Sequence, residues 1–189
     1  MRQRASTLLG ISLLLAAAGA AAADKVKPIE RYNAFGVSQQ RGKTSTIQIA
    51  IERWSTPEER QMLVDTLRQK GPQTLADALA KMPRVGWIRL PNTKAQDLRY
   101  AWQTPLPDGG RRVVIALDRI ANYAELTTAA RTQYYEFSVA EIRFDKDGKG
   151  EGKLSPLARV DVDKETNQIE VEDYSSQPVR LTKVQAVKP

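Results

Sequence analysis

The stretch EIRFDKDGKGEGKLS, Glu141 to Ser155, comes closest to a metal-binding loop. An EF-hand loop needs oxygen ligands at positions 1, 3 and 5, glycine at position 6 and glutamate at position 12. A loop starting at Asp145 has Asp147 and Gly150 in place, but lysine at the fifth position and proline at the twelfth. A start at Arg143 fails at the first and twelfth positions. Asp-Gly between two alternating runs predicts a hairpin turn. We therefore expect a turn, with a weak calcium site at Asp145 and Asp147 as the alternative.

A second group of acidic residues surrounds the segment 163–168. Two opposed carboxylates are what a glycosidase needs. These acids alternate with valine and isoleucine, so we interpret them as the polar outer face of a surface hairpin. A carboxylate-dependent hydrolase or carbohydrate-active enzyme remains the alternative function. The acidic residues are Asp161, Asp163, Glu165, Glu170, Glu172 and Asp173.

The chain contains no histidine and no cysteine. This composition excludes a Ser-His-Asp triad, a cysteine nucleophile, a histidine-ligated haem and an ordinary zinc site. An enzyme built from this chain would need a carboxylate pair, a Ser-Lys pair or a hard metal held by oxygen. We expect a protein that is not an enzyme and has no cofactor.

Trp87, Tyr100 and Trp102 form the predicted ligand-binding surface. Tyr100 and Trp102 are two residues apart on a predicted strand and share a face, and Trp87 lies one strand earlier. Aromatic walls are common in small-molecule sites, although core packing is the more frequent use of such residues. Arg99 and Arg112 lie on neighbouring strands, where they could orient an acidic group. Their alternative role is to protect strand edges from aggregation.

The elements that position these residues begin with two short helices predicted between residues 56 and 82. Thr56 is a good N-cap, Pro57 suits the first helical position, and Glu59 completes a capping box. Gly71 ends the first helix, and a second apolar stripe at helical spacing follows. Because each stripe is narrow, we expect this αα-hairpin to lie over a sheet rather than form a bundle.

The rest of the chain alternates between apolar and polar residues, which predicts strands joined by short turns and hence antiparallel pairing. So many strands must curl or split into two layers. We expect one α+β, mainly antiparallel domain over residues 33–189, a β-sandwich or open β-barrel with the helical hairpin inserted after an early strand. The segment 120–133 fits a helix or a loop. The predicted strands are 33–38, 44–54, 84–90, 97–104, 111–119, 135–144, 152–163 (broken near its proline), 168–174 and 179–184.

Residues 1–23 have the pattern of a secretory signal peptide: two arginines, an apolar run and small residues before Asp24. We expect cleavage there, a flexible leader at 24–32, no membrane span in the mature chain and a periplasmic or secreted location. An uncleaved anchor is the alternative. The remaining chain has 27 basic and 22 acidic residues, a net charge of +5. Because both signs are interspersed, we attribute this charge mainly to solubility. Export argues against nucleic acid as a partner.

Four segments resemble a group of secreted bacterial proteins typical of Acidobacteria and their neighbours: RVGWIRLP, DLRYAWQTPLPDGGRRVVIALDR, YEFSVAEIRFDKDGKGEGKLS and VEDYSSQPVRLTKV. The resemblance covers most of residues 33–184. That group has no assigned activity, cofactor or catalytic residue, so the resemblance implies export and a single domain but transfers no site. Our leading hypothesis is a non-enzymatic exported domain that binds a small ligand or a cell-envelope protein. A structural envelope component is the remaining alternative.

Overall fold

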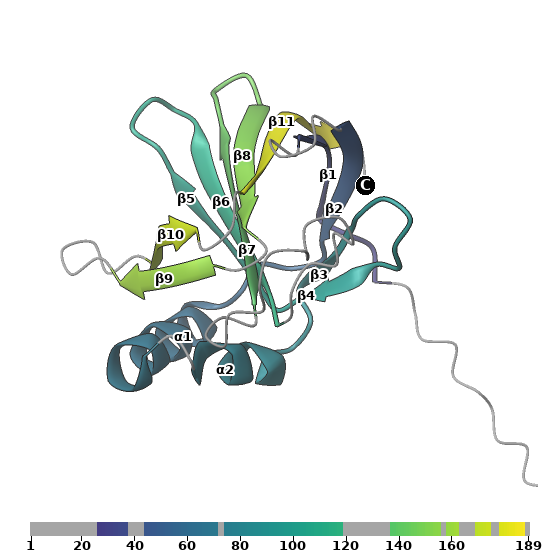
Figure 1. Cartoon of the computed structure of the whole chain (residues 1–189). Coiled ribbons are helices and arrows are strands. Elements are labelled where there is room, and N and C mark those ends of the chain that lie inside the picture. Colours follow the sequence, from purple (N-terminus) through teal and green to yellow (C-terminus); the bar gives the residue numbers. More distant parts are fainter. Residues whose placement is uncertain are drawn as a thin grey trace, which may run out of the picture.

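Nine antiparallel strands form one sheet that is nearly closed into a barrel (Figure 1). The computed structural model describes residues 26–37, 44–71, 74–118, 137–155, 158–162, 169–174 and 178–187, with only the backbone described in 158–162 and 169–174. The expected signal peptide and the ambiguous segment 120–133 lie outside these ranges. Of the expected leader, residues 26–32 are described. The order of the strands in the sheet is β4-β3-β2-β1-β11-β8-β7-β6-β5. Their bounds are β1 Glu30–Val37, β2 Thr44–Ile51, β3 Gly86–Arg89, β4 Gln96–Leu98, β5 Tyr100–Pro105, β6 Arg111–Leu117, β7 Ser138–Phe144, β8 Lys149–Ser155 and β11 Val179–Val187.

The barrel closes at Arg99, between two strands that follow each other in the chain but stand at opposite ends of the sheet order. The Arg99 N–H donates to the carbonyl oxygen of Ala116 at 2.9 Å. Just beyond β2, the Ser55 N–H donates to the Ala101 carbonyl at 2.8 Å, and the Ala101 N–H donates to the Ser55 hydroxyl at 3.1 Å. The two bonds between Ser55 and Ala101 satisfy backbone groups of the edge strand β5 that would otherwise lack a partner.

The prediction of one continuous strand over 97–104 is therefore wrong. The chain bends at Arg99, pairing with β3 before the bend and with β6 after it. Leu98 consequently belongs to the barrel interior, whereas Tyr100 packs on the outer side. Tyr100 and Trp102 share a face, as the alternation predicts, and Leu98 lies on the opposite side of the sheet.

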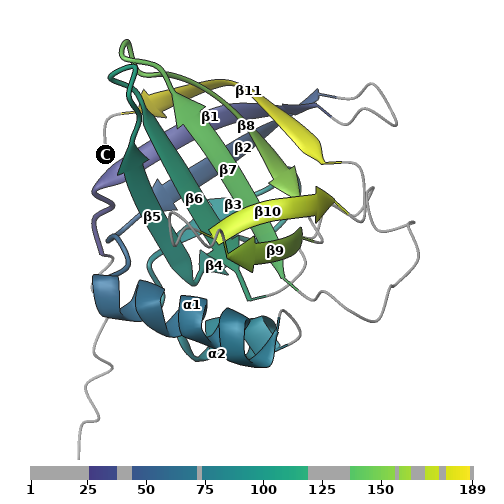
Figure 2. The same ribbon diagram turned by 90° about the vertical axis from the view of Figure 1, so that its left-hand side faces the viewer.

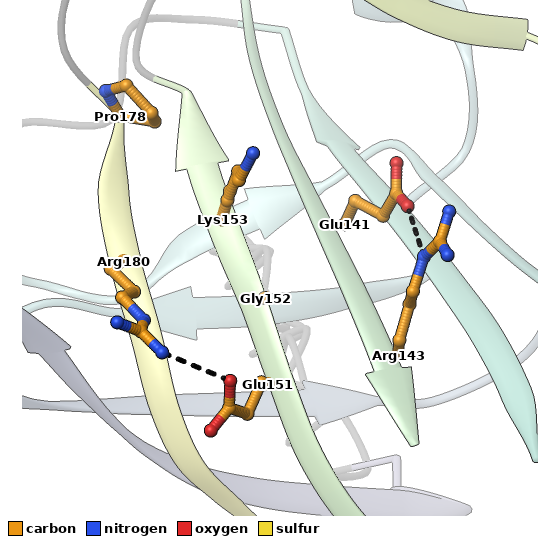
Figure 3. Close-up of a pocket in the computed structure, with 7 residues that line it drawn as sticks. All are labelled: Glu141, Arg143, Glu151, Gly152, Lys153, Pro178 and Arg180. Carbon is orange, nitrogen blue, oxygen red and sulfur yellow. Dashed lines mark hydrogen bonds and ion pairs between the residues drawn. The ribbon is translucent and has the colours of Figure 1, made fainter. Parts of the chain in front are cut away.

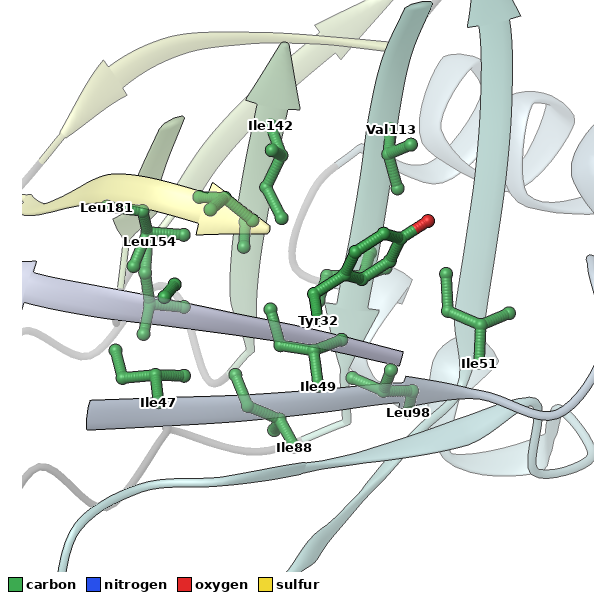
Figure 4. Close-up of a cluster of buried hydrophobic side chains, with 14 of the residues drawn as sticks. Tyr32, Ile47, Ile49, Ile51, Ile88, Leu98, Val113, Ile142, Leu154 and Leu181 are labelled. Carbon is green, nitrogen blue, oxygen red and sulfur yellow. The ribbon is translucent and has the colours of Figure 1, made fainter. Parts of the chain in front are cut away.

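The barrel interior is filled with apolar side chains (Figure 4). Ile47, Ile49 and Ile51 of β2 point inward, as their alternation predicts, and are at most 1 % exposed. They pack with residues of the other strands around Tyr32, whose side chain lies among them. Burial of this many apolar side chains is the main stabilising contribution to the fold. The other buried members of the cluster include Ala34, Val85, Ile88, Leu90, Leu98, Ala101, Val113, Ile115, Leu117, Ala140, Ile142, Phe144, Leu154, Val179, Leu181 and Val184.

The helical hairpin consists of α1 Pro57–Lys70 and α2 Leu75–Lys81. The predicted capping box is present: the Glu59 N–H donates to the Thr56 hydroxyl, and the Thr56 N–H donates to the Glu59 carboxylate. Both helices lie across one end of the barrel, at the bottom of Figure 2. There they form a second apolar cluster with the outward residues of β5, β6 and β7, so β6 is buried on both faces. The cluster comprises Leu63, Val64, Leu67, Leu75, Leu79, Met82, Tyr100, Val114, Ala116, Phe137 and Val139.

A separate two-stranded sheet, β9 Ala158–Val162 and β10 Ile169–Tyr174, interrupts the barrel sequence between β8 and β11. Figures 1 and 2 place this hairpin on the outer side of the barrel, beside α1, which β9 contacts. The acidic side chains predicted to line it lie outside the described part of the structure. Among the residues described, no helix is both long and apolar enough to cross a bilayer.

Candidate functional site

Two of the predicted aromatic ligand-binding residues, Tyr100 and Trp102, lie beneath the helices. Tyr100 is only 5 % exposed, and both residues belong to the second apolar cluster. The guanidinium of Arg60 on α1 lies 5.5 Å from the Trp102 ring centre, a cation–π distance. Burial raises the pKa of the Tyr100 hydroxyl to about 12, outweighing the opposing charges of Arg60 and Arg112. These contacts describe packing between helix and barrel.

Trp87 lies on the outer side of β3 and is not a member of that cluster. Its ring is half-buried and carries the Arg89 guanidinium at 5.3 Å. Arg99, at the barrel seam, is held by the carboxylates of Asp118 at 3.1 Å and Asp97 at 3.6 Å. The structure thus brings Tyr100 and Trp102 together but places Trp87 in a different setting. Ligand binding at this surface stays a prediction.

The Asp145 stretch forms the tight turn between β7 and β8. One carboxylate oxygen of Asp145 accepts hydrogen bonds from the backbone N–H groups of Asp147 and Lys149, both at 2.9 Å. The Asp145 N–H donates to the Lys149 carbonyl at 2.9 Å, and Gly148 supplies the positive φ of 77° that the turn needs. The described residues contain no group of three or more acidic side chains placed to hold a metal ion.

A different set of residues forms a charged surface on the outer side of β6, β7, β8 and β11, which we call the basic face. Its residues point outward because their strand neighbours Ile142, Leu154 and Leu181 belong to the interior core. Strand pairing places the charges in register in two rows. One row runs Glu141, Lys153, Arg180, and the other runs Arg112, Arg143, Glu151. Four cations therefore share this face with two carboxylates.

Diagonal ion pairs connect the two rows. The Glu141 carboxylate accepts from Arg112 at 2.9 Å and from the Nε of Arg143 at 3.2 Å. The Glu151 carboxylate lies 3.3 Å from the Arg180 guanidinium. Burial by itself raises the pKa of the Glu141 carboxyl, but the hydrogen bonds and charges of Arg112 and Arg143 outweigh it and lower that pKa below its ordinary value. Glu141 is therefore an ionised counter-charge at neutral pH.

Arg143 and Arg180 retain hydrogen-bond donors for a ligand. Their side chains are 68 % and 58 % exposed. Within the described part of the chain, each gives one nitrogen to a carboxylate, whereas a guanidinium carries five N–H donors in a fork that suits carboxylate and phosphate groups. The remaining donors face solvent on either side of β8.

A hollow of about 620 Å³ lies on this face (Figure 3). Figure 3 shows the side chains of Lys153 and Glu151 on β8 between Arg143 on β7 and Arg180 on β11. Gly152 lies between them and adds no side chain to the inner side of the strand. Pro178 stands at the rim, where the chain returns from the β9–β10 hairpin. The arrangement can hold an anionic group by ion pairs and charge-assisted hydrogen bonds.

Of this surface, sequence reasoning identified only Arg112 as a binding residue. Arg143, Lys153 and Arg180 were missed because the contacts between β8 and β11 depend on strand pairing across the β9–β10 insertion. One local signal exists in the run KGEGK, residues 149–153, where glycine alternates with charge. Such alternation indicates a strand with a charged outer face and a closely packed inner face.

Comparison of the chain with protein-family models, curated proteins and solved structures gives no significant match. Any function must therefore be inferred from the chemistry of the site.

Proposed function

We propose that this protein is an exported, non-enzymatic binding domain, and that its basic face binds an anionic group of a small ligand or of a cell-envelope partner. The observation that carries the proposal is the placement of Arg143 and Arg180, both more than half exposed, on either side of Lys153. Cations on three adjacent strands can contact one anion at the same time, because neighbouring strands are about 5 Å apart.

The filled interior supports binding on the outside of the barrel. The side chains that point inward form a continuous apolar cluster, and close packing of this kind leaves no room for a ligand. The signal-like pattern of residues 1–23 supports export, where anionic envelope polymers and acidic protein surfaces are available partners.

The described carboxylates support binding over hydrolysis. A glycosidase needs two facing carboxyl groups, one of them with a raised pKa that keeps it protonated as the general acid. Here hydrogen bonding from Arg53 lowers the pKa of Glu59, and Arg112 and Arg143 lower that of Glu141. Arginines also pair with other described acids, in the pairs Glu30–Arg111, Glu52–Arg84, Asp118–Arg99 and Glu151–Arg180.

Isothermal titration calorimetry of the purified protein with inorganic triphosphate, at low ionic strength, tests this proposal. We expect binding that weakens as salt is added, because exposed charges are screened over about 10 Å at 0.1 M salt. The double variant Arg143→Gln and Arg180→Gln should lower the affinity for triphosphate at least tenfold, since it removes both exposed guanidinium groups.

The matched control is the double variant Arg31→Gln and Arg89→Gln. Both arginines are exposed strand residues outside the basic face, on β1 and β3, and their loss changes the net charge by the same amount without changing the site. Binding that falls equally in a variant carrying Arg31→Gln and Arg89→Gln would reflect net charge alone. That outcome, or no binding of triphosphate by the unmodified protein, contradicts the proposal.

A further inference from the structure

A second hollow lies beside the hollow on the basic face, at the turn end of the barrel. The second has a volume of about 520 Å³ and is lined partly by Leu106 and Gln185. Arg143 and Glu151 line both hollows. The two hollows therefore adjoin at these residues, and we call them together the groove; it extends along β8 from Pro178 toward the β7–β8 turn.

Two lysines line the second hollow, Lys149 on β8 and Lys183 on β11. Lys149, Glu151 and Lys153 are alternate residues of one strand and point outward together. At about 3.4 Å per residue, Lys149 and Lys153 stand about 14 Å apart along the groove. A single small anion cannot contact both lysines, whereas an extended one can.

Lys183 has an unusual backbone. Its φ is 49°, in the left-handed region that lysine rarely adopts, and it lies where the pairing of β11 with β8 shifts between Leu181 and Val184. A β-bulge of this kind redirects a side chain, and strained backbone of this kind is concentrated at functional sites. Here the redirected side chain lines the groove.

The two aspartates that line the second hollow with Lys149 and Lys183 accept hydrogen bonds from the backbone of their own turns. Asp108 accepts a hydrogen bond from the Gly110 N–H of its own turn at 2.9 Å, and Asp145 accepts two from the turn that it begins. Glu141 is held by Arg112 and Arg143.

We propose that the ligand of this groove is a linear polymer bearing phosphate groups, which runs along β8 and contacts Lys153, Arg180 and Arg143 at one end and Lys149 and Lys183 at the other. This inference rests on the proposed anion-binding function of the basic face. A tetrahedral phosphate presents oxygens in several directions and so suits cations from three strands, whereas a planar carboxylate is best met in its own plane.

The groove also favours a phosphate polymer without bases. Proteins that bind single-stranded nucleic acid stack bases on exposed aromatic rings. Among the described residues that line the two hollows, the aromatic one is Phe144, and it is only 3 % exposed. The ring is covered and offers no stacking platform.

A chain-length series of inorganic polyphosphates, measured by calorimetry on the purified protein, tests this inference. We expect a polyphosphate long enough to reach both hollows to bind at least tenfold more tightly than triphosphate. Lys183→Asn should remove most of that gain and leave triphosphate affinity unchanged. Asparagine tolerates the left-handed backbone, so the melting temperature should stay equal or rise slightly.

Lys94→Gln is the charge-matched control, because Lys94 is exposed in the turn between β3 and β4, away from the groove. This variant should lower the affinity for the long polyphosphate by less than twofold. Equal affinity for short and long polyphosphates overturns the inference, and so do equal losses of long-chain affinity in the Lys183 and Lys94 variants. The proposed function would still be supported in either case if triphosphate binds.

The nature of the polymer is tested in the same series. An oligogalacturonate of matched charge and a single-stranded oligonucleotide should both bind more weakly than polyphosphate. Tighter binding of the oligogalacturonate contradicts the assignment of phosphate, and tighter binding of the oligonucleotide contradicts a polymer without bases.

Discussion

Tyr100 shows how the surroundings of a single residue decide its role. Its alternation with Trp102 identifies a shared strand face, which the structure contains, but a strand pattern does not say what covers that face. Helices α1 and α2 cover it, and burial there raises the pKa of the hydroxyl to about 12 from an ordinary value of 10. The ionised form of Tyr100 is therefore disfavoured in the folded protein.

This shift predicts a loss of stability at alkaline pH. Below pH 10 the tyrosine is neutral in both states and contributes its full stability. Above pH 10 it ionises in the unfolded chain first, so the contribution is lost as pH rises toward about 12. At pH 11 the cost is about 1.4 kcal/mol relative to pH 8.

Urea unfolding at pH 8 and pH 11 checks this loss. The unfolding free energy of the Tyr100→Phe variant should fall by about 1.4 kcal/mol less than that of the unmodified protein over this interval. Equal falls in the two proteins would mean that Tyr100 ionises in the folded state as readily as in the unfolded chain.

The cations of the basic face were harder to identify from the sequence. Arg143 and Arg180 lie on strands separated by the whole β9–β10 insertion, and only the register of β8 against both neighbours brings them to one hollow. Lysines and arginines are spread through the chain, so nothing local distinguishes these two from Arg31 or Arg89.

At the scale of secondary structure, the sequence predicts most of what is local. The capping box at Thr56, the alternation of β2 and the Asp-Gly turns all depend on neighbouring residues, and all are present. The break at Arg99 was missed because it depends on a hydrogen bond to β6. The residues near Arg99 in the sequence give no sign of that bond.

Strand β8 also requires glycine at position 152, which the alternation of its residues does not predict. A Cβ at Gly152 would collide with the backbone carbonyl of Glu141 on β7. The two strands therefore approach more closely here than any residue with a side chain allows.

Gly152→Ala should destabilise the protein by about 2–4 kcal/mol, because backbone atoms of β7 must move. Thermal or urea unfolding measures this effect. The matched control is Glu151→Ala, whose side chain is 69 % exposed on the same strand and whose loss should cost less than about 0.5 kcal/mol. Similar costs for the two variants would show that β7 and β8 can separate freely.

At the scale of the whole molecule, the sequence predicts the class of fold and leaves its closure open. Nine strands with short turns indicate a sandwich or a barrel, and the structure has a single sheet that nearly closes. The choice depends on the contacts of the edge strand β5, where Ala101 bonds to Ser55, a residue 46 positions earlier in the chain. Closure fills the interior and leaves the outer surface for function.

Two outer surfaces are candidates for ligand binding: the aromatic surface predicted from the sequence and the basic face found in the structure. Trp87, Tyr100 and Trp102 are half-buried or buried and engaged with neighbouring side chains. The basic face keeps exposed guanidinium groups above a hollow. This contrast is why we propose the basic face as the ligand-binding surface.

The most direct test is to map the binding surface by NMR, recording backbone amide shifts of the isotope-labelled protein as triphosphate is added. Our account predicts that the largest shifts fall in β7, β8 and the start of β11, around Arg143, Lys153 and Arg180. Shifts concentrated instead around Trp87, Tyr100 and Trp102, with the basic face unchanged, would contradict it.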